Sequence, residues 1–108
     1  MALVFRKVPD ISRYGEALLE NGILKKFNEK EGKVRPGTIN GGVYLMDRAL
    51  LDTIPDGQVS LENQMIPCWM KEGRSLGGFV NDGYFIDIGI PEDYFRFQDD
   101  VRRGTVKW

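Results

Sequence analysis

The hydrophobic pattern divides the first half of the chain into short strands separated by turn residues. Residues 2–8 are apolar and β-branched enough to predict a strand, and Pro9 ends it because proline cannot donate to a sheet ladder. Residues 38–46 predict another strand, which contains the adjacent glycines Gly41 and Gly42. Glycine inside a strand often marks the close approach of a ligand or of another backbone.

A hairpin is expected between these two strands. Residues 16–20 and 22–28 both have strand-like composition. They are separated by Asn21-Gly22, a dipeptide suited to the positive φ angles of a tight turn. The polar stretch 29–37 carries glycine and proline and predicts an exposed loop.

Helical signals follow the strand at 38–46. Asp47 is expected to cap a short helix that ends at Leu51. Ser60 is expected to cap a second helix, whose apolar residues recur at helical spacing until Gly73 terminates it. Pro67 falls inside that helix and predicts a kink.

The last third of the chain predicts two strands and a helix. Residues 76–80 and 83–88 are strand candidates, and the unbroken apolar run Tyr84-Phe85-Ile86 predicts burial on both faces. Pro91 then opens a helix that Gly104 closes. Strands interleaved with short helices predict an α/β or α+β fold.

Composition narrows the functional classes. A chain of 108 residues and 12.3 kDa predicts one small domain, residues 1–108. The formal charge of −1 disfavours non-specific nucleic-acid binding. With no histidine, the chain has no Ser-His or Cys-His nucleophile pair and no His-ligated metal. The single cysteine, Cys68, and the lack of a long apolar segment predict a cytoplasmic protein without a membrane segment.

Asp87 is the first candidate for chemistry. It follows an expected buried strand, and Gly89 and a helix N-terminus come directly after it. Open α/β sheets bind ligands at such strand ends, and one or two carboxylates with phosphate oxygens suit Mg²⁺. The alternative interpretation is that Asp87 only caps the following helix.

Two further groups of residues are candidates for binding a phosphorylated sugar. Glu29 and Lys30 offer an acceptor for hydroxyl groups next to a cation for phosphate, or else form ordinary solvated surface. Gly15, Asn40 and Gly42 offer backbone N–H groups and an amide to a polar ligand, or else serve only turn and strand-bulge geometry.

The order of these motifs resembles the C-terminal half of the sugar-1-phosphate nucleotidyltransferases. Within that family it is most similar to the heptose 1-phosphate guanylyltransferases, followed by the mannose-1-phosphate guanylyltransferases. The resemblance covers about residues 3–100 and rests on the segments YG (14–15), FNEK (27–30), INGGVY (39–44), SLE (60–62) and DGYFIDIGIPEDY (82–94).

The resemblance implies a doubly wound, Rossmann-like α/β sheet and the formation of an NDP-sugar and pyrophosphate from an NTP and a sugar 1-phosphate with Mg²⁺. Asp87 would ligate the metal, and Lys30 would contact the sugar phosphate. Glu29 would accept from sugar hydroxyls, while Gly15 and Asn40 with Gly42 would seat the sugar. The residues fit a direct attack of the phosphate oxygen on the α-phosphorus, which needs positioning and charge neutralisation.

Two departures from the family pattern change what is expected. Ile90 stands where the family has threonine, and isoleucine is a poor N-cap. The chain also lacks the glycine-rich GxGTRL-type loop and the other nucleotide-binding motifs of the N-terminal half. A fragment or split half without activity of its own is therefore expected, either dimeric or with a companion N-terminal half. The alternative is a non-catalytic interaction or sugar-nucleotide-sensing module.

Overall fold

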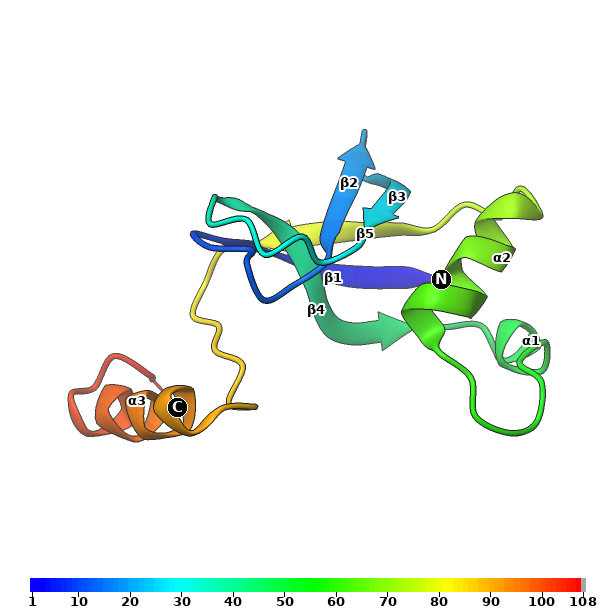
Figure 1. The fold of residues 1–108 in the computed structure, drawn as a ribbon. Coiled ribbons are helices and arrows are strands. Elements are labelled where there is room, and N and C mark those ends of the chain that lie inside the picture. The colour runs from blue at the N-terminus through cyan, green and yellow to red at the C-terminus, as the bar shows by residue number, and fades with distance from the viewer. Residues whose placement is uncertain (108) are drawn as a thin grey trace.

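A computed structural model describes residues 1–107 and contains a five-stranded sheet in the order β2-β3-β5-β1-β4 (Figure 1). The strands are β1 (Ala2–Val8), β2 (Glu16–Glu20), β3 (Ile23–Asn28), β4 (Gly37–Leu45) and β5 (Gly77–Asn81). Strand β1 pairs antiparallel with β4 and parallel with β5. Strands β2 and β3 form the predicted hairpin, and positive φ angles at Asn21 and Gly22 make its turn.

The helices are short and lie in the second half of the chain. They are α1 (Arg48–Leu51), the π-helix η1 (Leu61–Met65), α2 (Ile66–Lys71) and α3 (Pro91–Arg102). The predicted caps are confirmed: Asp47 accepts from the amide of Ala49 at 2.8 Å, and Ser60 Oγ accepts from the amide of Asn63 at 3.1 Å. No helix within residues 1–107 is long and apolar enough to cross a membrane.

The second helix is built differently from the expected kinked α-helix. It begins as a π-helix, in which the amide of Met65 bonds to the carbonyl of Ser60 at 3.1 Å, and continues as α2. Pro67 therefore lies at the junction of the two helices, in the first turn of α2, and the wider turn of the π-helix precedes it. The helix ends before Gly73, which has φ +79° as its predicted terminating role requires.

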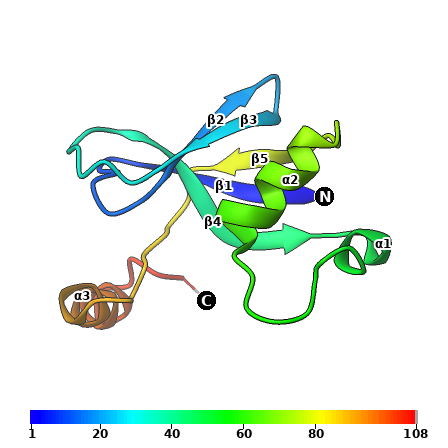
Figure 2. The same ribbon diagram turned by 45° about the vertical axis from the view of Figure 1, so that its right-hand side comes forward.

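Helix α2 covers one face of the sheet and makes the core there (Figure 2). Trp69 and Ile66 of the helix and Phe5 of β1 are completely buried. The indole N–H of Trp69 donates to Thr53 Oγ1 at 2.9 Å, so this buried donor has a partner. The packing of Trp69 and Ile66 in this core holds α2 on the covered face of the sheet.

The opposite face of the sheet is largely uncovered. Phe79 of β5 and Leu45 of β4 are 66% and 76% exposed. Helix α3 stands apart from the sheet, at the end of the segment 82–90 (Figure 1). An uncovered apolar sheet face is typical of a surface that another layer of protein covers.

The predicted strand at residues 83–88 is wrong. These residues have no regular secondary structure, and Tyr84 and Ile88 are 44% and 49% exposed instead of buried. Within residues 1–107 they pair with no strand, because the chain turns away after β5. The buried guanidinium of Arg6 makes this turn by donating to Asn81 Oδ1 at 2.5 Å and to the carbonyl of Gly83.

Candidate functional site

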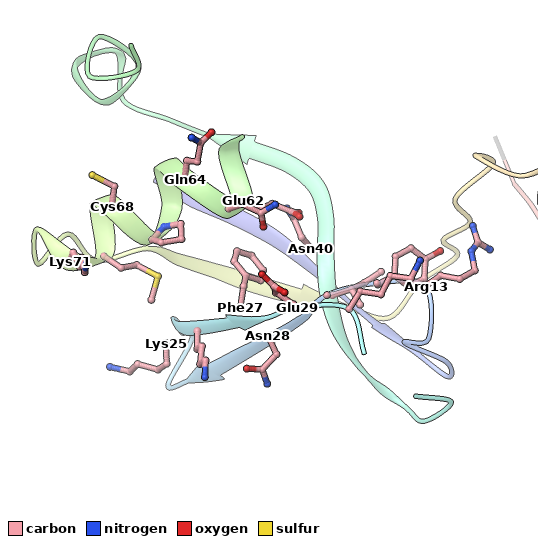
Figure 3. Close-up of a pocket in the computed structure, with 18 residues that line it drawn as sticks. Arg13, Lys25, Phe27, Asn28, Glu29, Asn40, Glu62, Gln64, Cys68 and Lys71 are labelled. Atoms are coloured by element: carbon pink, nitrogen blue, oxygen red, sulfur yellow. The ribbon is translucent and has the colours of Figure 1, made fainter. Parts of the chain in front are cut away.

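One large cavity lies between strand β3 and the helix formed by η1 and α2, with β4 and the β1–β2 loop closing one end; we call it the β3–helix pocket (Figure 3). Its volume is about 1290 Å³. It is lined by Arg13, Tyr14, Gly15, Lys25, Lys26, Phe27, Asn28, Glu29, Lys30, Ile39, Asn40, Glu62, Asn63, Gln64, Pro67, Cys68, Met70 and Lys71.

Four of the predicted site residues meet in this pocket. The lining includes Gly15, Glu29, Lys30 and Asn40. These residues come from three separate parts of the chain: the loop before β2, the end of β3, and β4. Glu29 and Lys30 follow directly after β3, so the end of that strand delivers both to the cavity. Neither forms an ion pair with any residue of 1–107, which leaves both charges available to a ligand.

Asn40 is held by a network across the pocket wall. Its side-chain amide donates to Glu62 Oε1 and to the hydroxyl of Tyr44, and its Oδ1 accepts from the amide of Gly42 at 2.9 Å. Figure 3 shows Asn40 and Glu62 directed toward each other. Burial raises the pKa of Tyr44, so its hydroxyl stays protonated at neutral pH. The network fixes the orientation of Asn40 and leaves one lone pair of Oδ1 for a ligand.

The two predicted glycines act in different ways. Gly42 has φ +77° and does not line the pocket; its amide holds Asn40 in place. Gly15 does line the pocket, and a β-carbon there would lie 2.9 Å from the carbonyl oxygen of Asn28. Gly15 is therefore required for the close approach of the β1–β2 loop to the end of β3.

Asp87 lies outside the pocket lining and next to Arg13, which does line the pocket. Its Oδ1 accepts from the amide of Gly89 at 2.9 Å, and its other oxygen is 4.0 Å from Arg13 Nη2. The alternative interpretation, that Asp87 caps α3, is wrong: the N-cap residue is Ile90, whose side chain makes no capping bond. Arg13 also pairs with Asp93 of α3, and this hydrogen bond raises the pKa of the guanidinium.

The side chains around Asp87 limit the kind of metal site that this residue can form. In the part of the chain that the structure describes, no three His, Cys, Asp or Glu side chains form a cluster that fits a metal ion. Asp87 is nevertheless 45% exposed as a side chain, so one of its oxygens can reach a ligand. A single carboxylate suits Mg²⁺ only when phosphate oxygens and water complete the coordination.

The pocket carries an excess of positive charge that the sequence analysis did not find. Five cations line it, against only the two acids Glu29 and Glu62, and only Arg13 among the five is paired with an acid, Asp93, within residues 1–107. The whole chain, by contrast, has a formal charge of −1. The cations are Arg13, Lys25, Lys26, Lys30 and Lys71. Lys71 reaches the pocket because α2 packs on the sheet, and such a long-range arrangement leaves no local signal in the sequence. A pocket of this kind attracts anionic ligands.

The two relatives described here are both named as sugar-1-phosphate guanylyltransferases. No protein-family model matches the chain. It is 31% identical over 103 residues to a D-glycero-alpha-D-manno-heptose 1-phosphate guanylyltransferase of Aneurinibacillus thermoaerophilus, covering 94% of this chain and 44% of the relative. It is 36% identical over 82 residues to a mannose-1-phosphate guanylyltransferase of Mycobacterium tuberculosis, covering 74% of this chain and 23% of the relative.

A solved structure shows the same fold. HddC from Yersinia pseudotuberculosis, complexed with GMP-PN, superimposes with a TM-score of 0.76 and 31% identity over 93% of this chain and 43% of that one. The matched region is the C-terminal part of the relatives. The chain thus spans less than half the length of the relatives it matches.

Proposed function

Because the chain corresponds in sequence and fold to the C-terminal part of the sugar-1-phosphate nucleotidyltransferases, we propose that it is the sugar-phosphate-binding half of such a transferase. The reaction would join a sugar 1-phosphate to GTP and yield a GDP-sugar and pyrophosphate. Guanine is proposed because the relatives named above are guanylyltransferases.

The observation that carries this proposal is the charge and shape of the β3–helix pocket. A sugar phosphate needs acceptors for its hydroxyl groups next to cations for its phosphate. Glu29 and the Asn40–Glu62 pair offer acceptors, while Lys30 offers a cation that no acid of residues 1–107 pairs with. The ring of Phe27 lies beside Glu29 and is directed toward the helix (Figure 3). It offers an apolar surface for a sugar ring.

The proposed mechanism is a direct displacement at phosphorus. A phosphate oxygen of the sugar 1-phosphate attacks the α-phosphorus of GTP, the new P–O bond forms, and pyrophosphate leaves with the electrons of the broken bond. Lys30 would neutralise the sugar phosphate and Glu29 would orient the sugar, while Gly15, Asn40 and Gly42 would seat it. Mg²⁺, when bound, would neutralise charge on the phosphates, and Asp87 is the residue of this chain that would ligate it.

The nucleotide would be held by a second protein half. The sequence has no glycine-rich phosphate loop, and the sheet face that carries Phe79 and Leu45 is apolar and uncovered. We propose that a nucleotide-binding half packs on this face and supplies the loop. Without it, the chain of 108 residues is expected to bind sugar phosphates or NDP-sugars weakly and to release no pyrophosphate.

Titration calorimetry with mannose 1-phosphate tests the sugar-phosphate site. The Lys30→Gln variant is expected to lose about tenfold or more in affinity, because a charge-assisted hydrogen bond contributes about 1.5–3 kcal/mol. The matched control Lys7→Gln removes the charge of an exposed lysine outside the pocket and should bind like the parent chain. Equal affinity of all three proteins would remove Lys30 from the site.

A titration with GDP-mannose tests the metal role separately. Mg²⁺ is expected to strengthen binding to the parent chain and to have no effect on Asp87→Asn. The same gain from Mg²⁺ in both proteins would show that Asp87 does not ligate the ion.

A further inference from the structure

The β3–helix pocket has two cationic ends, and the proposed function uses only one of them. Arg13 lies at one end, while Lys25 and Lys71 lie at the opposite end (Figure 3). Lys30 belongs with Arg13, because it follows the end of β3, which the β1–β2 loop carrying Arg13 approaches closely at Gly15. Phe27, Glu29 and Glu62 lie between the two ends. A ligand that fills the whole pocket therefore meets positive charge at both of its ends.

The second cationic end follows from the opposite directions of strand β3 and the η1–α2 helix. Lys25 is near the beginning of β3, and Lys71 is the last residue of α2. The amide of Leu24 bonds to the carbonyl of Leu76 at 2.8 Å, so the chain just after the helix is tied to the beginning of β3. This bond brings Lys25 and Lys71 to the same end of the cavity.

The structure gives these two lysines no acidic partner. Neither forms an ion pair with any residue between 1 and 107. Glu72, the acid next to Lys71 in the chain, instead pairs with Arg74 at 3.0 Å. Two like charges at the same end of a cavity repel each other, and an anion bound there relieves that repulsion.

The size of the pocket leaves room for a longer ligand. Its volume of about 1290 Å³ exceeds the roughly 300–1,000 Å³ usual for small-molecule pockets. From Lys25 to Glu29 the chain advances four residues, or roughly 13 Å at the usual rise of a strand. The flexible lysine side chains shorten the gap between the charged groups, so a single substituted sugar ring can extend from one end to the other.

We propose that the pocket takes a sugar 1-phosphate with a second anionic group on the carbon farthest from C1. Lys25 and Lys71 would hold that group, which is a phosphate or a carboxylate. The proposal rests on the proposed function, because it places the 1-phosphate at Lys30. It adds that the sugar is acidic at its far end.

Calorimetry at one ionic strength with three probes tests this. The probes are mannose 1-phosphate, mannose 1,6-bisphosphate and glucuronic acid 1-phosphate. The parent chain is expected to bind at least one of the doubly anionic probes about tenfold or more tightly than mannose 1-phosphate. Preference for the bisphosphate identifies a phosphate as the second group, and preference for the uronate identifies a carboxylate.

Two double variants with the same change of charge show whether the far lysines cause the preference. Lys25→Gln/Lys71→Gln should bind all three probes equally, and Lys7→Gln/Lys107→Gln, whose lysines lie outside the pocket, should keep the preference. Circular dichroism checks that both variants keep the fold.

The outcomes separate this inference from the proposed function. If mannose 1-phosphate binds in a Lys30-dependent way but no doubly anionic probe binds better, the second anion site is wrong and the proposed function stands. A preference that survives in Lys25→Gln/Lys71→Gln also overturns the second anion site. If no probe binds to the parent chain, both proposals are wrong.

Discussion

Gly77 and Gly78 are adjacent in β5, yet the structure tolerates a side chain at only one of them. A β-carbon at Gly78 would lie 2.0 Å from the carbonyl oxygen of Leu3 and 2.9 Å from the ring of Phe5. At Gly77 the nearest atom would be 3.7 Å away, which is ordinary contact. Gly78 is therefore required by the close approach of β5 to β1 at the edge of the core.

Alanine substitution of these two glycines should have very different effects. Gly78→Ala is expected to lower the free energy of unfolding by about 3 kcal/mol or more, because the clash is with backbone that cannot move without breaking the ladder. Gly77→Ala is expected to change it by less than about 1 kcal/mol. Urea denaturation followed by tryptophan fluorescence measures both, and equal destabilisation would contradict the assignment.

At the residue scale, the sequence predicted those parts of the pocket that depend on local geometry. Glu29 and Lys30 were found because they follow a strand, and Asn40 because glycines follow it. Lys71 was missed, because its place opposite β3 depends on how α2 packs on the sheet. Asp87 lies outside the lining but next to Arg13, a contact between segments far apart in the chain.

At the element scale, α3 combines an unfavourable N-cap with favourable first-turn charges. Ile90 has the extended backbone of an N-cap residue, φ −122° and ψ 151°, but no side-chain acceptor. Glu92 and Asp93 lie in the first turn, where acids stabilise a helix, and Asp93 also pairs with Arg13. The helix is thus tied to the β1–β2 loop by an ion pair while its first amides lack a cap.

Replacing Ile90 by threonine should therefore stabilise α3 by about 1 kcal/mol. The expected result is slower hydrogen exchange of the amides in the first turns of the helix, measured by NMR. Ile88→Thr is the matched control, because Ile88 is exposed and does not occupy the cap position. Faster or unchanged exchange in Ile90→Thr would show that the cap does not limit this helix.

Most elements were also predicted from signals within a few residues of each other. The wrong strand at residues 83–88 shows that such local signals do not predict strand pairing. The hairpin at Asn21-Gly22 and the helix at Pro91–Arg102 depend on turn and cap chemistry within a few residues. A strand at residues 83–88 was inferred from its apolar run alone. Such a run forms a strand only beside another strand, and Arg6 instead turns the chain off the sheet at Gly83.

At the scale of the whole molecule, the sheet has one covered and one uncovered face. Trp69 and Ile66 of α2 seal the first face. On the second, Phe79 and Leu45 are mostly exposed. Arg6 lies buried under Phe85 at the end of this face, with its Nε unpaired within residues 1–107. The exposure of these apolar residues is consistent with the proposed nucleotide-binding half.

A fluorescent probe of apolar surface, anilinonaphthalene sulfonate, tests this proposal. The chain alone is expected to bind the dye, and Phe79→Ser/Leu45→Ser to bind much less of it with unchanged circular dichroism. Addition of the separately expressed nucleotide-binding half of a guanylyltransferase should displace the dye from the parent chain. Dye binding that persists in the presence of that half would contradict docking on this face.

Every residue that lines the β3–helix pocket falls between positions 13 and 71. One continuous stretch of gene therefore encodes all the walls of this pocket. In the proposed transferase, mutations or recombination within that stretch would alter sugar preference while the β5 and α3 regions stay intact. The choice of sugar and the choice of base would then be free to evolve independently.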